Sequence, residues 1–177
     1  PSPSTFDSLQ KNIELNHLGG LVHAKQTALG AEEGVTTFTA SMDVRNHVLP
    51  DWITDVPSIE VKVSTAIEFM NKFGIPVMIK IDVEGFEMEV LSGMHDKLSS
   101  EDLKVVILEL NTSSMRYGND DLQIHHHMLK NGFIAVQYDP FKRLIETIDS
   151  YGSHNTIYVK DIDWIRGRLQ SAKPFQI

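Results

Sequence analysis

Three acidic side chains stand at the ends of two apolar segments of the 177-residue chain. Asp82 and Glu84 lie at the end of the string KIDVEG (80–85), and Glu109 lies at the end of VVILEL (105–110). Such apolar runs are typical of strands buried in a parallel sheet, and open α/β sheets bind ligands beyond the carboxyl ends of their strands. Side chains two residues apart on a strand point to the same side, so Asp82 and Glu84 should face one cleft. A carboxylate there could accept a proton or orient a hydroxyl.

The same carboxylates also have a purely structural explanation. Gly85 permits a tight turn into a following helix, and acidic residues near the positive end of a helix, such as Glu84 and Glu87, stabilise it without any chemistry. Asp82 would then pair with Lys80 or with a backbone amide. Both interpretations are open from the sequence alone, and they differ in whether a cleft adjoins the carboxylates.

The elements that must position these residues alternate between strands and helices. Strands are predicted at 21–29, 35–39, 59–63, 77–83, 103–110, 133–138 and 156–159, and helices at 5–17, 65–73, 86–98 and 120–130. Thr65 and Glu68 have the spacing of a capping box, which supports a helix start. The alternation predicts an α/β doubly wound sheet whose last strands could be antiparallel.

Two segments match no regular element. Residues 42–57 contain Pro50, Pro57 and an isolated Trp52 without a clean period, and we expect a long loop there. Residues 166–177 are expected to form a polar C-terminal tail. No shift in composition divides the chain, so residues 1–177 should be one domain or most of one.

Net charge and composition exclude several classes of partner. The formal charge is -8 and the chain has no basic patch, so nucleic acid and anionic membrane surfaces are disfavoured. There is no cysteine, which fits a reducing compartment, and no apolar run long enough for a membrane helix. We expect a soluble cytoplasmic protein, with the oligomeric state left open.

One string carries a family resemblance. KIDVEGFEMEVLSGM (80–94) resembles the signature of the FkbM methyltransferase family, in which a strand ending in Asp and Glu is followed by Gly, an aromatic residue, Glu and an apolar helix. Flanking segments are similar to other parts of that family: PSPSTFDSLQKNIELN, QTALGAEEGVTTF, VVILELN, NGFIAVQYDPFKR and NTIYVKD. The resemblance implies a Rossmann-like methyltransferase sheet, the cofactor S-adenosylmethionine, and a hydroxyl acceptor on a small molecule or glycan.

The resemblance also implies roles for particular residues. Asp82 would lie near the sulfonium end of the cofactor, and Ala28 would line the adenine slot. Glu84 would accept the proton or orient the acceptor hydroxyl, and Glu109 would form a second polar wall. The family's Gly-rich turn after the first strand and its ribose-binding acid after the second have no counterpart in residues 1–177. The first βαβ portion is therefore expected to be missing, and this chain alone should bind S-adenosylmethionine weakly or not at all.

Four further residues are candidates for binding the acceptor. Arg116 and Asn119 follow the strand that ends at Glu109, and both suit fixed hydrogen bonds to a hydroxylated or acidic substrate. Trp52 could stack on a sugar ring, and His154 could reach a substrate from the loop before the last strand. An ordinary surface or core position is an equally open explanation for each of them.

No metal site is expected at the three consecutive histidines, His125 to His127. Successive helical residues are about 100° apart, so three in a row cannot converge on one ion. Two other functions stay open: a non-catalytic binding remnant of a methyltransferase, and, more weakly, a metal-dependent hydrolase that uses Asp82, Glu84 and a histidine.

Overall fold

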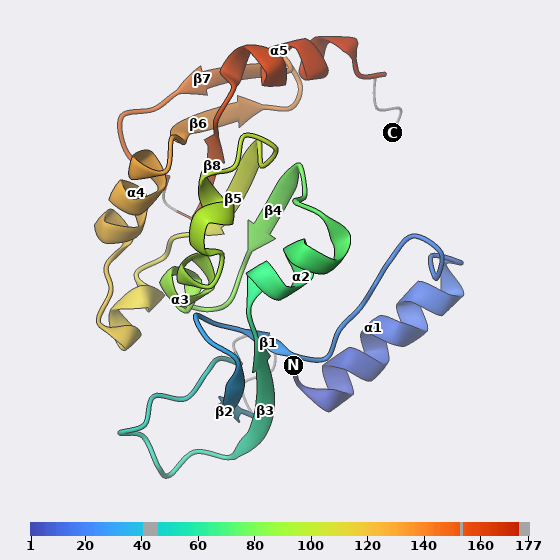
Figure 1. The fold of residues 1–177 in the computed structure, drawn as a ribbon, viewed down its shortest axis with the longest axis vertical. Coiled ribbons are helices and arrows are strands. Elements are labelled where there is room, and N and C mark those ends of the chain that lie inside the picture. The colour runs from blue at the N-terminus through green and yellow to red at the C-terminus, as the bar shows by residue number, and fades with distance from the viewer. Residues whose placement is uncertain (41–45, 153, 174–177) are drawn as a thin grey trace.

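The structure, a computed structural model, describes residues 1–40, 46–152 and 154–173, which form two β-sheets with helices packed around them (Figure 1). This confirms the mixed α/β class that the sequence predicted. In chain order the elements are α1 (Pro3–Leu15), β1 (Ala28–Leu29), β2 (Gly34–Thr39), β3 (Ser58–Ser64), α2 (Ala66–Phe73), β4 (Met78–Ile81), α3 (Glu87–Ser92), η2 (His95–Ser99), β5 (Val105–Glu109), η3 (Ser113–Tyr117), α4 (Asp121–Lys130), β6 (Ile134–Asp139), β7 (Leu144–Thr147), β8 (Asn155–Val159) and α5 (Ile162–Ser171).

The first three strands form a small sheet of their own, in the order β1-β3-β2. β1 runs parallel to β3 and β2 runs antiparallel to it. Residues 46–49 extend the sheet beside β2, because Val48 bridges to Phe38 and the Leu49 amide donates to the Thr37 carbonyl at 2.7 Å. The sheet buries a core of its own, made of Ala28, Phe38, Val48, Val61 and Val63.

The other five strands form the larger sheet, in the order β4-β5-β8-β6-β7. β4 and β5 are parallel, whereas β8 is antiparallel to both β5 and β6. The last strands are therefore antiparallel, the arrangement left open by the sequence. The expected single sheet is instead two sheets in the described residues, since the partner of β1 is β3 and no strand pair joins β1 to β4.

Several predicted elements differ from the structure for identifiable reasons. β1 is only two residues long, because its pairing with β3 is limited to Val63 and Ser64. β4 was expected to be covered on both faces, but it is the edge of its sheet and Met78 is exposed. The helix expected over 86–98 is broken at Gly93, whose backbone lies against the Gly30 carbonyl too closely for any Cβ.

The end of the chain also departs from the prediction. Residues 166–171, expected in a polar tail, form the second half of α5, which the Asp161 side chain caps by accepting from the Trp164 amide. β7 was not predicted, because only Ile145 of its four residues is buried. Residues 172 and 173 follow α5, and 174–177 lie outside the described residues. Residues 42–45 of the expected long loop also lie outside the described residues, whereas 46–57 contain a single β-bridge and no helix or strand.

Two helix starts follow their sequence signals closely. The Thr65 side chain accepts from the Glu68 amide at the start of α2, as the capping spacing predicted. Asp120 forms a complete capping box with Gln123 at the start of α4. These helices place their apolar faces on the larger sheet, with Ile124 and Met128 of α4 fully buried in its main core.

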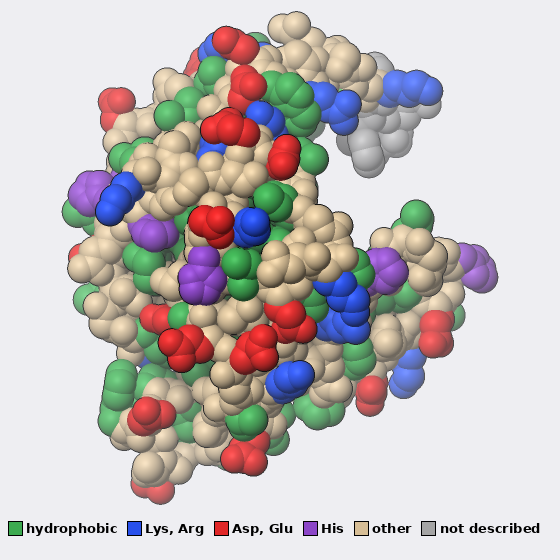
Figure 2. All heavy atoms as spheres, in the orientation of Figure 1, with side chains coloured by type: hydrophobic (Ala, Val, Ile, Leu, Met, Phe, Trp, Pro, Cys, Tyr) green, Lys and Arg blue, Asp and Glu red, His purple; other side chains and the backbone are tan. Residues whose placement is uncertain are grey.

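The larger sheet is covered on both faces. The main core packs α3 and α4 against one face through Val90, Leu91, Val106, Leu108, Ile124 and Met128. On the other face α5 packs through Ile165 on Val136, Ile145 and Val159. None of the helices in the described residues is long and apolar enough to cross a membrane. Acidic and basic side chains are interspersed on the face shown in Figure 2, without a continuous basic patch.

Candidate functional site

The turn between β4 and α3 is shaped by a buried carboxylate. Glu84 and Gly85 both have positive φ angles, 54° and 103°, which reverse the chain sharply. Glu87 is only 1% exposed, and its Oε1 accepts hydrogen bonds from the amides of Val83 (3.3 Å) and Gly85 (3.2 Å). A left-handed conformation at a residue other than glycine is strained, and such strain often accompanies functional turns. Glu87 therefore holds the turn that presents Glu84.

Three carboxylates converge at this turn. In the parallel pair of β4 and β5, Ile81 is opposite Leu108, so Asp82, directly after β4, and Glu109, the last residue of β5, lie side by side at the end of the sheet. One carboxylate oxygen each from Asp82, Glu84 and Glu109 lie within 4.8 Å of one another. This is the convergence expected from the two strand ends.

Neighbouring groups set the protonation of this cluster. The hydrogen bond from Lys80, with which Asp82 forms an ion pair, lowers the pKa of Asp82, and a hydrogen bond to Glu109 lowers it further against the effect of burial. The hydrogen bond to Asp82 raises the pKa of Glu109, and burial and the charges of Asp82 and Glu84 raise it further. A proton in the pair is therefore held by Glu109 in preference to Asp82.

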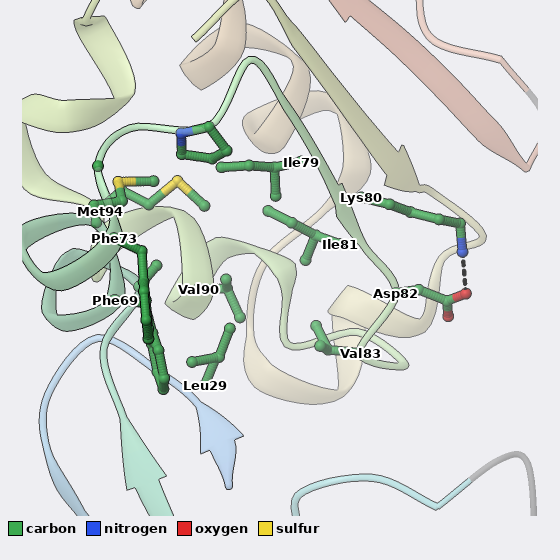
Figure 3. A pocket seen from close by; sticks show the side chains of 14 residues that line it. Leu29, Phe69, Phe73, Ile79, Lys80, Ile81, Asp82, Val83, Val90 and Met94 are labelled. Carbon is green, nitrogen blue, oxygen red and sulfur yellow. Dashed lines mark hydrogen bonds and ion pairs between the residues drawn. The ribbon is translucent and has the colours of Figure 1, made fainter. Parts of the chain in front are cut away.

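Two cavities meet beside the cluster and share the wall formed by Leu29, Asp82 and Val83. The larger, of about 440 Å³, is almost entirely apolar. Figure 3 shows side chains of α2, β4 and α3 pointing into it, while the Asp82 carboxylate turns away from them toward Lys80.

The smaller cavity, of about 280 Å³, lies between the two sheets. Ala28, Phe38 and Val48 line it from the small sheet, and Asp82 and Glu84 line it from the β4–α3 turn. It therefore brings an apolar wall and two of the three carboxylates to the same space. Among the described residues that line this cavity there is no lysine, arginine or histidine.

The short helix η3 packs directly on the turn. Arg116 donates from its guanidinium to the Glu84 carbonyl at 3.1 Å, and the Ser113 carbonyl lies against Gly85. The buried carboxylate of Asp121 fixes the start of η3, because it accepts from the Thr112 amide and the Ser114 hydroxyl. Two sets of hydrogen bonds therefore hold the left-handed conformation of Glu84: those that Glu87 accepts from the turn amides and the one that Arg116 donates to the Glu84 carbonyl.

The structure brings together Ala28, Asp82, Glu84 and Glu109, the residues expected around the cofactor and the reacting hydroxyl. The four acceptor candidates are placed differently. Trp52 is 71% exposed and lines neither of the two cavities. Asn119, just after η3, is partly buried and also lines neither of them. The His154 carbonyl accepts from the Leu110 amide, which places His154 next to the end of β5. Their roles, like those of the carboxylates, stay predictions.

Sequence reasoning missed several residues that shape the site. Glu87 was interpreted only as a residue that favours the helix, although its burial and two backbone bonds organise the turn. Phe86 and Tyr117 join the core of the small sheet, although both lie outside that sheet in the sequence. An aromatic residue directly after a glycine turn was a signal for Phe86, whereas no local pattern marked Tyr117.

Within the described residues, the group of side chains able to hold a metal ion consists of the three clustered carboxylates and includes no histidine. His125 is buried, and its Nδ1 hydrogen bonds with the Tyr158 hydroxyl at 3.0 Å. It is thus part of the packing between α4 and β8. The histidine that the hydrolase hypothesis required is not part of the acidic cluster.

Replacing Gly85 by alanine is expected to destabilise the protein by about 3 kcal/mol. A Cβ at this position would lie 2.5 Å from the Ser113 carbonyl oxygen, in a backbone conformation that L side chains rarely adopt. Urea unfolding of Gly85→Ala measures the loss. Gly167→Ala is the control, because Gly167 lies on α5 with nothing near its Cβ position, and alanine there should be neutral or stabilising. Equal stability of the two variants would contradict the close packing of η3 on the turn.

Glu87→Gln is expected to make the free energy of unfolding depend less on pH. Burial raises the pKa of Glu87, so the folded state holds this proton more tightly than the unfolded state does. Stability from this group is therefore greatest at acidic pH, and it falls as the pH rises from the usual value of 4.5 through the raised value. Glutamine keeps an Oε1 acceptor for the two amides but carries no charge.

The expected result is a stability advantage of Glu87→Gln over the wild type that grows from pH 4 to pH 7, measured by urea unfolding at each pH. Exposed Glu33→Gln controls for the change in net charge. A constant difference between Glu87→Gln and the wild type across this range would show that Glu87 is not the titrating group.

The family model and the curated relatives that match this chain all carry methyltransferase in their names. Residues 1–135 match the model of the "Methyltransferase FkbM domain" family. The chain is 29% identical to "Methyltransferase 1" of Beauveria bassiana, in an alignment covering 55% of this chain and 47% of that protein. It is 30% identical to "Hexuronic acid methyltransferase AglP" of Haloferax volcanii, over 60% of this chain and 44% of that protein. The chain thus spans less than half the length of either relative. No solved structure matches it significantly.

Proposed function

The chain belongs to the FkbM methyltransferase family, and from this membership we propose that it takes part in methyl transfer from S-adenosylmethionine to a hydroxyl oxygen of a small molecule or glycan. The observation that carries this proposal is the convergence of Asp82, Glu84 and Glu109 beside a cavity with an apolar wall. Both relatives are named as methyltransferases, in agreement with the reaction.

The smaller cavity suits part of this cofactor. Its apolar wall, with Ala28, Phe38 and Phe86, fits the flat face of an adenine, and Asp82 offers a negative charge that suits a sulfonium. The Lys80 contact keeps Asp82 ionised, because it lowers the pKa of that carboxyl. When bound, S-adenosylmethionine supplies an already activated methyl group, so the protein has mainly to align the acceptor and remove its proton.

Glu84 is the best candidate for that proton transfer. Asp82 is a weakened base because of Lys80, and Glu109 is engaged in its hydrogen bond with Asp82. Glu84 is held by its backbone, through Arg116, while its side chain lines the cavity and is only partly exposed. A positioned carboxylate within hydrogen-bond reach of a hydroxyl acts as a general base, and here it would take the proton as the oxygen gains the methyl group.

The acceptor is proposed to be a neutral hydroxyl compound. The relative from Haloferax volcanii is named for hexuronic acid, which carries a carboxylate at neutral pH. Among the described residues that line the smaller cavity, Asp82 and Glu84 carry carboxylates and none has a cationic side chain; Pro1 also lines it, and Lys80 pairs with Asp82 from outside the lining, so Glu84 is the carboxylate without an ion pair. Like charges about 4 Å apart repel by roughly 1–4 kcal/mol, depending on the solvent exposure. A second carboxylate is therefore disfavoured next to the reacting oxygen.

Transfer of radiolabelled methyl groups tests this function in an active protein that contains residues 1–177. Methyl glucoside and methyl glucuronide form a matched pair, since they differ only at C6, which is a hydroxymethyl group in the first and a carboxylate in the second, and methylation is scored at the ring hydroxyls that both carry. We expect methylation of the neutral glycoside to be favoured by about tenfold or more in kcat/KM, with the preference decreasing in high salt. Preference for the glucuronide would overturn the neutral acceptor. Hydrolysis that requires added metal, without methyl transfer, would instead support a hydrolase.

A further inference from the structure

The smaller cavity is bounded by two bodies that share no strand pair. One body is the small sheet with residues 46–49, and the other is the larger sheet with its turns. They are joined covalently through α2, and near the end of β1 their backbones meet where the Gly30 carbonyl lies against Gly93. The width of the cavity therefore depends on other contacts between the two bodies, at a distance from the contact of Gly30 with Gly93.

Tyr117 makes such a contact on the side of residues 46–49. Its hydroxyl donates to the Val48 carbonyl at 2.6 Å, across 69 positions of sequence. Its ring packs edge-on against Phe86, with ring centres 4.9 Å apart. Val48 and Phe86 are themselves lining residues of the cavity, the first beside the small sheet and the second in the β4–α3 turn. One side chain thus contacts both walls.

We propose that Tyr117 is a positioning residue, whose hydroxyl holds the small sheet against the β4–α3 turn and so fixes the width of the cavity between Ala28 and the carboxylates. This inference rests on the proposed function for its catalytic consequence, though not for its structural part. Tyr117 belongs to η3, and the preceding residue of that helix, Arg116, donates a hydrogen bond to the Glu84 carbonyl. The same short helix therefore positions Glu84 and the wall that faces it.

The surroundings of Tyr117 favour a directed hydrogen bond. Burial raises the pKa of its hydroxyl, so the group stays neutral and remains a donor at physiological pH. Val48 cannot shift its carbonyl freely, because the flanking residues bond to β2 through the His47 carbonyl and the Leu49 amide. If Val48 moves, the small sheet must therefore move with it.

Tyr117→Phe removes the hydroxyl and keeps the ring, and its effect can be measured without any ligand. The chain has no cysteine, so two introduced cysteines are the only sites for spin labels. Exposed Val35 on β2 and Leu122 on α4 place one label on each body, and Leu122 with Leu144 on β7 gives a control pair within the larger body. The measurement is the distribution of label distances by pulsed electron paramagnetic resonance.

Loss of one hydrogen bond should raise the population with separated sheets about fivefold, as a second, longer distance between positions 35 and 122. The control pair should be unchanged. Tyr158→Phe is the matched variant, because it loses another buried tyrosine hydroxyl bond, to His125, that lies within the larger body. An unchanged distribution for positions 35 and 122 in Tyr117→Phe, or the same change in Tyr158→Phe, would overturn the proposal.

The catalytic consequence is measured separately in an active protein that contains this sequence. Misplacement of walls that align reacting groups lowers the rate more than the affinity, so Tyr117→Phe should lower kcat about tenfold while KM changes less than about threefold. A wild-type kcat in a variant whose sheets separate would refute the positioning role. If no methyl transfer is found in any variant, the proposed function fails, while the distance measurement still decides whether Tyr117 fixes the sheets.

Discussion

Glu84→Gln is expected to lower kcat for methyl transfer by about 10² to 10⁴ in an active protein containing this sequence, with cofactor affinity nearly unchanged. Glutamine keeps the size and one oxygen of the side chain but cannot accept the proton of the hydroxyl. The backbone of the turn should persist, because Arg116 bonds the Glu84 carbonyl and not its carboxylate. Single-turnover kinetics gives the rate, and calorimetric titration with S-adenosylhomocysteine gives the affinity.

Glu89→Gln is the matched control, since Glu89 lies on α3 outside the acidic cluster. It should leave kcat within about twofold, as expected for a surface substitution away from the reacting atoms. If Glu84→Gln weakens S-adenosylhomocysteine as much as it slows turnover, Glu84 belongs to the cofactor site, and the proton must go to another group.

Residues 1–177 by themselves are expected to bind S-adenosylmethionine at least about a hundredfold more weakly than a version extended at the N-terminus by a strand, a Gly-rich turn and an acidic residue of the family type. The family resemblance implies that those parts bond the methionine portion and the ribose hydroxyls, and we expect no equivalent of them in residues 1–177. Each unpaired polar group of a buried ligand costs about 1–3 kcal/mol, so several together remove most of the affinity.

Calorimetric titration of both proteins measures the difference. Binding by residues 1–177 in the micromolar range would show that the described cavities complete the site without those parts. If the extended version binds no better and transfers no methyl group, the non-catalytic remnant becomes the better hypothesis.

The sequence predicted those parts of the fold that local signals specify. The capping spacing of Thr65 and Glu68 placed the start of α2 to within one residue, because such a signal acts within one turn of a helix. The close approach of the Gly30 carbonyl to Gly93, where α3 ends, could not be predicted, since the two glycines are 63 positions apart in sequence. The exposure of β4 likewise depends on its place at the edge of a sheet, which an apolar string does not reveal.

For the site, the sequence indicated which residues converge but not what holds them. Asp82 and Glu109 ended consecutive apolar strands, and parallel pairing brought them together, as the pattern implied. The pKa shifts of this pair depend on a hydrogen bond between residues 27 positions apart, which spacing alone does not define. The contact of Tyr117 with Val48 spans an even longer separation and has no local signal.

The two sheets draw on separate, consecutive stretches of the chain. β1 to β3 come from residues 28–64 and β4 to β8 from residues 78–159, so neither ladder of backbone hydrogen bonds needs a strand from the other. The contact between the two sheets is therefore made by side chains and turns, among them Phe86 and Tyr117, and not by strand pairing. The smaller cavity lies in that contact, and a ligand can therefore enter by parting side chains and short turns while every strand pair stays intact.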